Sequence, residues 1–326
     1  MYISVIIPAY NGQNTIRQCI ESILNSDWNQ AEIEIIVVDD ASTDDTPHVV
    51  EKLQVYHPNI KLIKHNKNRG AAACRTTGLQ HARGEFLFVL SQDAFAHPEW
   101  IRKAVGAFAE NQRVGIVQGR VELIGQISTP FYHATQVRKL NRHFPTVAIA
   151  YRAEAVDHAG RYFPVELSDL GDDTDLAWRI IRAGYAPTWI EAITAYHGVY
   201  PVRNGFRKNI EGAWRGPRSF ALLIKRNPEM RKTFVIPFVW ENPIRLFEFL
   251  TLLAALVILP FYPMAGIGLF IVSFFSCYYW MRDILKASRI PWIYRLLVLP
   301  ANRYICNILH TISLWYGSLR YRTVVL

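Results

Sequence analysis

The sequence predicts an α/β protein built on a mainly parallel sheet, followed by a strongly apolar helical region. Three observations predict this arrangement. Short runs of β-branched and aromatic residues alternate with segments of helical periodicity. Residues 85–90 are almost wholly apolar, as is typical of a central strand in a parallel sheet. Residues 249–281 contain no Asp, Glu, Lys, Arg or His, and a bilayer-spanning helix needs about 20 apolar residues.

Each expected element has a local signal. The expected strands are short apolar runs at residues 3–8, 33–38, 60–65, 85–90, 114–123, 146–151 and 186–195. The expected helices have helical periodicity or small residues throughout, at 15–25, 46–56, 70–81, 98–110 and 172–183. Capping residues at 42–46 open the second helix, and Gly184 ends the last one.

Composition divides the chain into four parts. An α/β domain over 1–200 precedes a basic amphipathic connector over 201–243, an apolar hairpin over 244–281 and membrane-associated helices over 282–326. Pro260 and Pro263 split the hairpin into two segments, which we expect to cross the membrane and return. Residues 291–319 are apolar but carry three basic or histidine side chains. We expect an interfacial helix there, and a third span is the alternative.

The positive charge of the chain is concentrated beside the apolar region. The formal net charge is +9, and residues 200–232 hold nine Lys or Arg against two Glu. This position favours contact with anionic membrane lipids over binding to nucleic acid. The N-terminal sequence has no signal-peptide pattern, so we expect the α/β domain on the cytoplasmic side of the cell (inner) membrane. The four cysteines are scattered, and buried thiols are expected.

Carboxylates stand where the expected strands end or a helix begins. Asp39 and Asp40 close the second strand, Asp93 follows the fourth, and Asp172 and Asp173 open the last helix. An open α/β sheet binds ligands at the carboxyl ends of its strands. Acids gathered there suit a metal ion, a nucleotide and a proton acceptor, so the sequence predicts an enzyme.

The order of these motifs resembles glycosyltransferase family 2, the inverting transferases with a GT-A fold. The matching motifs lie within about residues 1–200 and run VIIPAYN at 5–11, VVDDASTD at 37–44, NKNRG at 66–70, GEF at 84–86, QD at 92–93, YR at 151–152, DDTDLAWR at 172–179 and YH at 196–197. The resemblance implies a mixed, mainly parallel sheet flanked by helices, the fold of nucleotide-diphospho-sugar transferases.

The resemblance also implies a nucleotide pocket. Its residues end or follow the first four strands and are Pro8, Tyr10, Asp39, Asp40, Arg69 and Gln92. A planar ring can lie over the base while a carboxylate accepts a hydrogen bond from a base N–H. The alternative for the two acids is a helix-capping turn. Gly12 replaces a common acid of the family, which puts details of the pocket in doubt.

A metal site for Mg²⁺ or Mn²⁺ is the second implication. Asp93 occupies the place of the metal-binding acid of the family, and His197 matches a position that often supplies a further ligand. The family usually has a second acid where this chain has Ser91, so we expect weak metal binding without the donor. The alternative for His197 is an ordinary histidine at a strand end. The Ser91–Ala94 variant resembles rhamnosyltransferase-like members, which hints at a deoxysugar donor.

The general base is the third implication. Asp173 matches the base that takes a proton from the acceptor hydroxyl, which a single inverting displacement requires. Asp172 is expected to orient the loop or to bind the acceptor. The alternative is that both acids cluster at a helix start because the helix dipole favours them.

Together these features predict an inverting glycosyltransferase of cell-surface polysaccharide or glycolipid synthesis. It would take a nucleotide-diphospho-sugar donor and a lipid-linked or other glycan acceptor at the cytoplasmic membrane face. The basic residues Arg207, Arg215 and Arg218 would meet lipid headgroups or the pyrophosphate of the acceptor. Two alternatives remain: a processive polysaccharide synthase, and an inactive relative that serves as a membrane scaffold.

Overall fold

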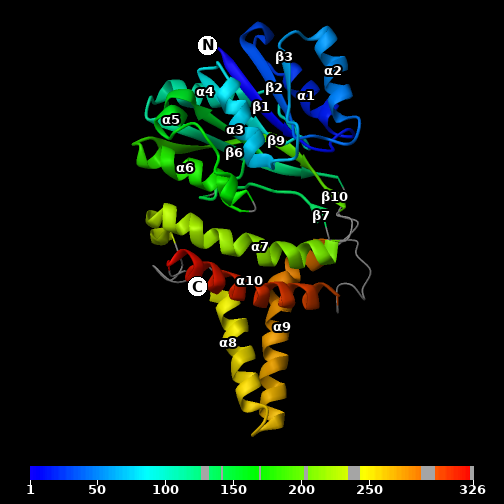
Figure 1. Ribbon diagram of the computed structural model, residues 1–326, viewed down its shortest axis with the longest axis vertical. Coiled ribbons are helices and arrows are strands. Elements are labelled where there is room, and N and C mark those ends of the chain that lie inside the picture. Colours follow the sequence, from blue (N-terminus) through cyan, green and yellow to red (C-terminus); the bar gives the residue numbers. More distant parts are fainter. Residues whose placement is uncertain are drawn as a thin grey trace. The chain divides into compact units, whose positions relative to one another are not determined.

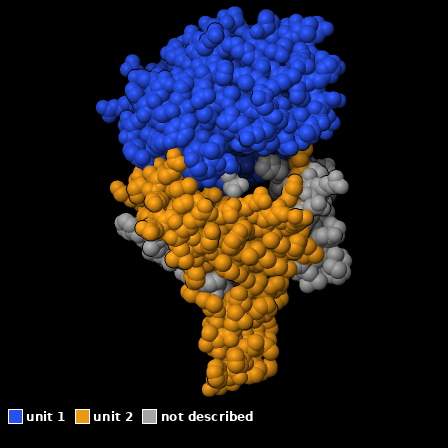
Figure 2. Space-filling view, viewed as in Figure 1, with its two compact units in different colours: residues 1–125, 134–199 blue, residues 126–133, 200–326 orange. Residues whose placement is uncertain are grey.

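The chain forms two compact units, shown in different colours in Figure 2. The first comprises residues 1–125 and 134–199, and the second comprises residues 126–133 and 200–326. The computed structural model describes residues 1–125, 132–140, 142–168, 170–201, 205–233, 243–287 and 298–323.

The first unit is built on an eight-stranded mixed sheet, in the order β3-β2-β1-β4-β8-β6-β9-β5. Its strands are β1 (Ile3–Ala9), β2 (Ile33–Asp39), β3 (Ile60–Lys64), β4 (Phe86–Leu90), β5 (Ala94–Ala96), β6 (Val114–Ile124), β8 (Ala148–Arg152) and β9 (Ala186–Gly198). The first four are parallel, β8 is antiparallel to both β4 and β6, and β6 is parallel to β9. The predicted α/β class and the mixed, mainly parallel sheet are therefore confirmed.

Helices cover both faces of this sheet (Figure 1). They are α1 (Ile16–Leu24), α2 (Thr46–Tyr56), α3 (Ala71–His81), α4 (Trp100–Glu110), α5 (Ala153–His158) and α6 (Asp172–Arg182), with the short 3₁₀ helices η1 (Gln30–Glu32) and η2 (Val165–Leu167). One buried apolar cluster includes residues of α1, α2 and α4, and the other includes residues of α3, α5 and α6. Strands β1 and β2 contribute alternate residues to the two clusters, which explains why they are apolar on both faces.

The register of the sheet brings the expected site residues to one edge. Ala9 at the end of β1 pairs with Asp39 at the end of β2, and β4 runs parallel to β1 on its other side. The segments that follow these three strands therefore leave the sheet at the same edge. Two expected strands are longer or later than predicted: β9 continues to Gly198, and β8 begins at Ala148.

The second unit is mainly helical. It contains α7 (Gly205–Arg226), the 3₁₀ helix η3 (Pro228–Thr233), α8 (Pro243–Ile258), α9 (Pro263–Ala287) and α10 (Leu299–Tyr321). The short strands β7 (Tyr132–His133) and β10 (Tyr200–Pro201) pair antiparallel. Helices α7 and α10 pack closely at Gly317. A Cβ added there would lie 2.7 Å from the carbonyl oxygen of Arg218, so a larger residue would not fit.

The apolar segments form a helical hairpin, α8 and α9, which lie side by side (Figure 1). Many of its apolar side chains are exposed, including Phe261, Tyr262 and Met264 around the turn, and Met264 is 82% exposed. We expected this hairpin to cross a membrane. Among the described residues, however, no helix has both the length and the apolar character that a membrane crossing requires. Of the expected helix at 291–319, residues 291–297 lie outside the described part, and the rest belongs to α10.

Candidate active site

The loops that follow β1 and β2 are hydrogen-bonded to each other. The backbone N–H of Asn11 donates to Ser42 Oγ (2.9 Å), and that of Gly12 donates to Thr46 Oγ1 (2.8 Å). In return, Asn11 Oδ1 accepts from the backbone N–H of Thr43 (2.8 Å). Asn11 adopts a positive φ of 48°, which asparagine tolerates better than most residues. These reciprocal bonds fix the geometry of the expected base-binding loop.

Asp39 presents an unused acceptor at this edge. Its side chain is buried, and Oδ2 accepts a hydrogen bond from the backbone N–H of Ser42 (3.1 Å). Oδ1 is also buried but has no hydrogen-bond partner within the described residues. A buried acceptor without a partner is costly, so a ligand that donates a hydrogen bond would be favoured here. Tyr10 stays 45% exposed after the end of β1. The helix-capping alternative does not account for Asp39 Oδ1, which is buried without a hydrogen-bond partner within the described residues.

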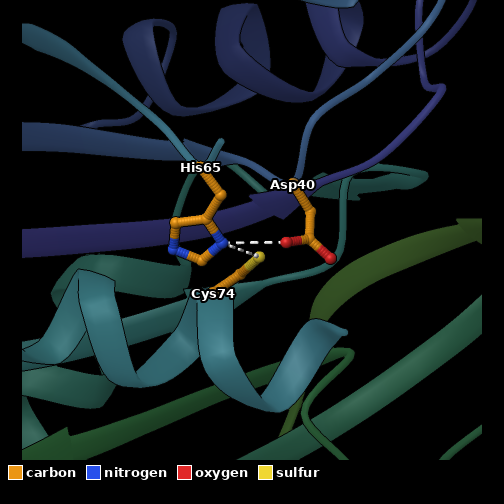
Figure 3. Close-up of side chains that lie close together, drawn as sticks. All are labelled: Asp40, His65 and Cys74. Carbon is orange, nitrogen blue, oxygen red and sulfur yellow. Dashed lines mark hydrogen bonds and ion pairs between the residues drawn. The ribbon is translucent and has the colours of Figure 1, made fainter. Parts of the chain in front are cut away.

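Asp40 has a different role, because both of its oxygens are occupied. They accept hydrogen bonds from the backbone N–H groups of Arg69 (2.9 Å) and Gly70 (2.7 Å). His65 Nδ1 lies 2.8 Å from Asp40 Oδ1 (Figure 3). Gly70 has a φ of +85°, in the region that favours glycine. Asp40 therefore holds the loop that carries Arg69.

Asp40, His65 and Cys74 also form a cluster that could in principle hold a metal ion, since their ligand atoms lie within 4.8 Å of one another (Figure 3). Their chemistry argues against this use. The side chains are already engaged with one another and with the fold: His65 Nδ1 lies 2.8 Å from Asp40 Oδ1, His65 Nε2 lies 2.9 Å from Thr77 Oγ1, and burial raises the pKa of the Cys74 thiol to about 12. The ligand oxygens of Asp40 are engaged by the loop. The cluster fits a structural network better than a metal site.

Asp93 and His197 lie together, as the sequence predicted for a metal site. Strand β5, which follows Asp93, pairs with β9 so that Ala94 lies opposite His197. His197 Nε2 is 3.2 Å from Asp93 Oδ1. A carboxylate oxygen and an imidazole nitrogen at this spacing are ligands that Mn²⁺ accepts, so the residues present fit a divalent cation.

The backbone of Thr135 supports the ring of His197 from behind. Thr135 N–H donates to Nδ1 (2.7 Å), while Thr135 O lies 3.2 Å from the same nitrogen. The bond from Thr135 N–H makes Nδ1 an acceptor and leaves the ring proton on Nε2, which faces Asp93. Nε2 would serve as a ligand in the other tautomer, in which Nδ1 donates to Thr135 O. Ser91, which replaces the usual second acid, has its hydroxyl 3.5 Å from the carbonyl oxygen of Thr146.

Asp172 and Asp173 occupy the first turn of α6, behind Gly171 with a φ of +103°. Asp172 is buried and forms an ion pair with the guanidinium of Arg75. Arg75 also donates to Thr146 Oγ1 (2.7 Å). Of the two roles expected for Asp172, this ion pair supports the orienting one.

Asp173 is the better proton acceptor of the two. It stays partly exposed, and its oxygens accept hydrogen bonds from the backbone N–H groups of Thr174 (2.8 Å) and Thr146 (3.3 Å). Burial and the neighbouring charge of Asp172 raise the pKa of Asp173 to about 7, although Arg75 opposes this shift. A carboxylate with a pKa near neutrality is matched to general base catalysis.

Residues 146–147 connect the surroundings of Asp173 with those of Asp93. Thr146 N–H donates to Asp173, and Val147 O accepts from the backbone N–H of Ser91 (2.9 Å). The sites of Asp173 and Asp93 are therefore parts of one hydrogen-bonded edge of the first unit. Sequence reasoning did not identify Arg75 or Thr146 as site residues. The signal available for Arg75 was a charged residue that directly follows four small residues, Ala71–Cys74, in a helix.

The basic residues of α7 belong to the second unit. Arg207 and Arg215 are exposed, and Arg207 forms an ion pair with Glu211 one turn later (2.8 Å). Arg218 is half-buried. Exposed pairs of this kind add little to stability, so the charges of Arg207 and Arg215 remain available to anionic groups.

Solved structures of other proteins share the fold of this chain. A crystal structure of residues 1–349 of Staphylococcus aureus TarS has a TM-score of 0.54 at 20% identity, and covers 99% of this chain and 92% of that one. The mannosyltransferase PcManGT from Pyrobaculum calidifontis, solved with GDP-Man and Mn²⁺, has a TM-score of 0.58 at 22% identity, over 98% of this chain and 86% of that one. The chain therefore shares the GT-A fold of these proteins.

Sequence comparison finds a family to which the chain is similar. Residues 4–163 match the model described as Glycosyl transferase family 2. The glycosyltransferase AglE of Haloferax volcanii is 25% identical over 209 residues, which cover 61% of this chain and 68% of AglE. The poly(ribitol-phosphate) β-N-acetylglucosaminyltransferase TarS of S. aureus is 30% identical over 182 residues, 53% of this chain but only 31% of TarS. Over residues 4–163 the chain is similar to glycosyltransferase family 2, the family that its motifs predicted.

Proposed function

We propose that the protein is an inverting glycosyltransferase that moves a sugar from a nucleotide-diphospho-sugar to a hydroxyl group of a glycan acceptor. The observation that carries the proposal is Asp173, a partly exposed carboxylate whose pKa is raised to about 7 on the same edge as the open oxygen of Asp39. The likeness to glycosyltransferase family 2 and the names of the protein's relatives support transfer from a nucleotide sugar. Minor teichoic acid biosynthesis protein GgaA, 37% identical over 118 residues, supports a role in cell-surface polysaccharide synthesis.

In the proposed reaction, Asp173 takes the proton of the acceptor hydroxyl while that oxygen attacks the anomeric carbon. The bond from this carbon to the diphosphate oxygen breaks, and the nucleoside diphosphate leaves from the opposite face, so the anomeric centre is inverted. Asp172 and Thr146 keep Asp173 oriented. A divalent cation bound by Asp93 and His197 would neutralise charge on the leaving diphosphate. At the other end of the donor, Asp39 accepts a hydrogen bond from the base, with Pro8 and Tyr10 beside it, and Arg69 completes the pocket.

A donor screen tests this proposal. The purified protein is incubated with UDP-GlcNAc, GDP-mannose, dTDP-rhamnose and related donors, each with Mg²⁺ or Mn²⁺, and release of the nucleoside diphosphate is measured. UDP-GlcNAc and GDP-mannose are included because solved neighbours bind them, and dTDP-rhamnose because of the Ser91–Ala94 motif. We expect release from one donor with an added metal, and inverted anomeric configuration in the product by NMR. Retained configuration would overturn the single-displacement mechanism.

We further propose that the second unit attaches to a membrane and that the acceptor is lipid-linked. The support is the exposed apolar hairpin together with the basic residues of α7, a combination that suits the interface of an anionic bilayer. Attachment at the cytoplasmic face of the inner membrane would place the enzyme where nucleotide sugars are made.

Flotation with liposomes tests the attachment. We expect the protein to float with phosphatidylglycerol vesicles, and a triple substitution of Phe261, Tyr262 and Met264 by Ser to reduce the floating fraction. The matched control replaces Val55 and Tyr56, which are 76% and 80% exposed on the α/β unit, by Ser. If the control lost as much binding as the hairpin variant, the hairpin would not be the attachment site.

A processive synthase and an inactive scaffold remain the competing functions. The segment from Glu211 to Gly216 resembles the Gln-x-x-Arg-Trp signature of processive enzymes without matching it. Both Asp93 and Asp173 are present, whereas an inactive relative is expected to lose one of them. Product length distinguishes the first alternative, and the donor screen distinguishes the second.

A further inference from the structure

The side chain of Gln92 is bonded to the backbone of a distant loop. Its Oε1 accepts a hydrogen bond from the N–H of Tyr10 (2.9 Å), and its Nε2 donates to the carbonyl oxygen of the same residue (3.0 Å). Tyr10 follows β1 and Gln92 follows β4, two strands that are neighbours in the sheet. A carboxamide is the side-chain group that offers a donor and an acceptor in this geometry; a carboxylate offers acceptors alone.

Gly12 provides the space that this amide occupies. A Cβ at position 12 would lie 2.3 Å from Oε1 and 2.6 Å from Cδ of Gln92, which is closer than atoms can approach. The backbone at Gly12 is not in the left-handed region, so the glycine is required by space and not by its φ. Its N–H also donates to Thr46 Oγ1, so the loop is held from the other side and cannot easily retreat.

The position of Gln92 in the chain gives this contact a consequence for the donor. Gln92 directly precedes Asp93, whose carboxylate lies against His197. Tyr10 lies in the loop that is bonded to the residues after Asp39. The amide of Gln92 therefore connects two parts of the proposed donor site. One is the part at Asp93, proposed for the diphosphate and the metal ion, and the other is the part at Asp39, proposed for the nucleotide base.

We infer that Gln92 is a positioning residue that sets the separation between the base pocket and the metal site, and that Gln92 and Gly12 act as one unit. The inference rests on the proposed function, because it concerns how the donor is held. It also explains why this chain has glycine at position 12, where a common acid of the family would collide with the amide of Gln92.

A double-mutant cycle tests the inference, with Gln92→Ala, Gly12→Ala and the double variant. The dissociation constants of UDP, GDP and dTDP are measured with Mn²⁺ by calorimetry, and KM and kcat are measured for the donor found active. Loss of two ordinary hydrogen bonds predicts about tenfold weaker binding of the preferred nucleoside diphosphate for Gln92→Ala, and a similar loss for Gly12→Ala. The double variant should be no weaker than Gln92→Ala, because the collision is gone. KM should rise more than kcat falls.

Two controls separate positioning from a loss of folding. Gly106→Ala changes a glycine of α4 that has no atoms within 4 Å of the added Cβ, and should bind as the wild type does. Gln92→Glu keeps the size and one acceptor but loses the donor, and should weaken binding with little change in melting temperature. Additive losses in the double variant would overturn the inference. So would wild-type affinity in Gln92→Ala, which leaves the proposed function intact, whereas failure of the wild type to bind any nucleoside diphosphate would overturn both.

Discussion

The first unit has two acidic pairs, Asp39–Asp40 and Asp172–Asp173. In both, one carboxylate has a structural role and the other is available to a ligand. In each pair one carboxylate is consumed by the fold: Asp40 by the backbone of the Arg69 loop, and Asp172 by Arg75. The other is left for a ligand: Asp39 Oδ1 has no hydrogen-bond partner within the described residues, and Asp173 stays partly exposed. Adjacent acids at the edge of a sheet are therefore better understood as an anchor and a working group than as two equivalent ligands.

The order within the pair differs. At the end of β2 the first acid is the working group, whereas at the start of α6 it is the second. In a strand, successive side chains point to opposite faces, and in a helix they are about 100° apart, so neighbouring acids reach different surroundings in both cases. Replacing one member of a pair at a time tests this division, and variation of the pH tests the ionisation of Asp173.

Replacing Asp173 by Asn should have the largest effect. The amide cannot accept the acceptor's proton, so turnover should fall by about 10²–10⁴-fold, the usual contribution of a general base. Nucleoside diphosphate affinity should stay near the wild-type value. Asp157→Asn, on the exposed side of α5, is the matched control and should retain activity. Normal turnover by Asp173→Asn would refute the assignment of the base.

Replacing Asp172 by Ala should act mainly on stability. It leaves the buried guanidinium of Arg75 without its counter-charge, and breaking such a pair costs about 3–5 kcal/mol. The measurement is the urea midpoint of the α/β unit within the full chain, followed by tryptophan fluorescence. A variant that also replaces Arg75 by Met should recover part of the loss. An unchanged midpoint in Asp172→Ala would mean that this acid is not the anchor of its pair.

Replacing Asp39 by Asn should weaken the nucleotide and leave the fold in place. A hydrogen bond to a charged acceptor contributes about 1.5–3 kcal/mol, so at least tenfold weaker binding is expected. Asp40→Asn is the comparison: it should lower the melting temperature, because the amide cannot accept from both Arg69 and Gly70 as the carboxylate does. The same loss of affinity without loss of stability in both variants would remove the distinction between them.

The pH dependence should report the ionisation of Asp173 without any substitution. Since the pKa of Asp173 is raised to about 7, activity should fall about tenfold per pH unit below that value as the base is protonated. Stability should change in the opposite direction. A raised carboxyl pKa favours the folded state at low pH, and this contribution is lost as the pH rises from 3.8, the ordinary pKa of an aspartate, through about 7. The variant Asp173→Asn should flatten this part of the stability profile, which thermal melts at several pH values would measure.

The sequence predicted those features that depend on local pattern and chain order. Strand ends at Asp39 and Asp93 and the helix start at Asp172 follow from apolar runs and capping residues, and they place the acids on one edge. The partner of Asp172 could not be predicted, because Arg75 lies 97 positions earlier and the contact depends on the full topology. Likewise, nothing local to β8 says that it inserts antiparallel between β4 and β6.

In the second unit, local sequence patterns were a poor guide to one helix. Gly212, Gly216 and Pro217 lower the helical propensity of the connector, yet α7 runs through all three. Gly216 and Pro217 are buried, and tertiary packing on α10 outweighs propensity. Apolar composition predicted the helices of the hairpin, but the expected membrane crossing was not found in the described residues.

The bonds between the loops after β1 and β2 have a consequence for the kinetics of nucleotide binding. Asn11, Gly12 and Gln13 are already fixed by side chains of the β2 loop, so no ordering of these residues has to accompany association. Mixing with a nucleoside diphosphate in a stopped-flow instrument should therefore give a single exponential. Its rate should rise linearly with concentration, without the plateau that a slow rearrangement of the pocket would produce.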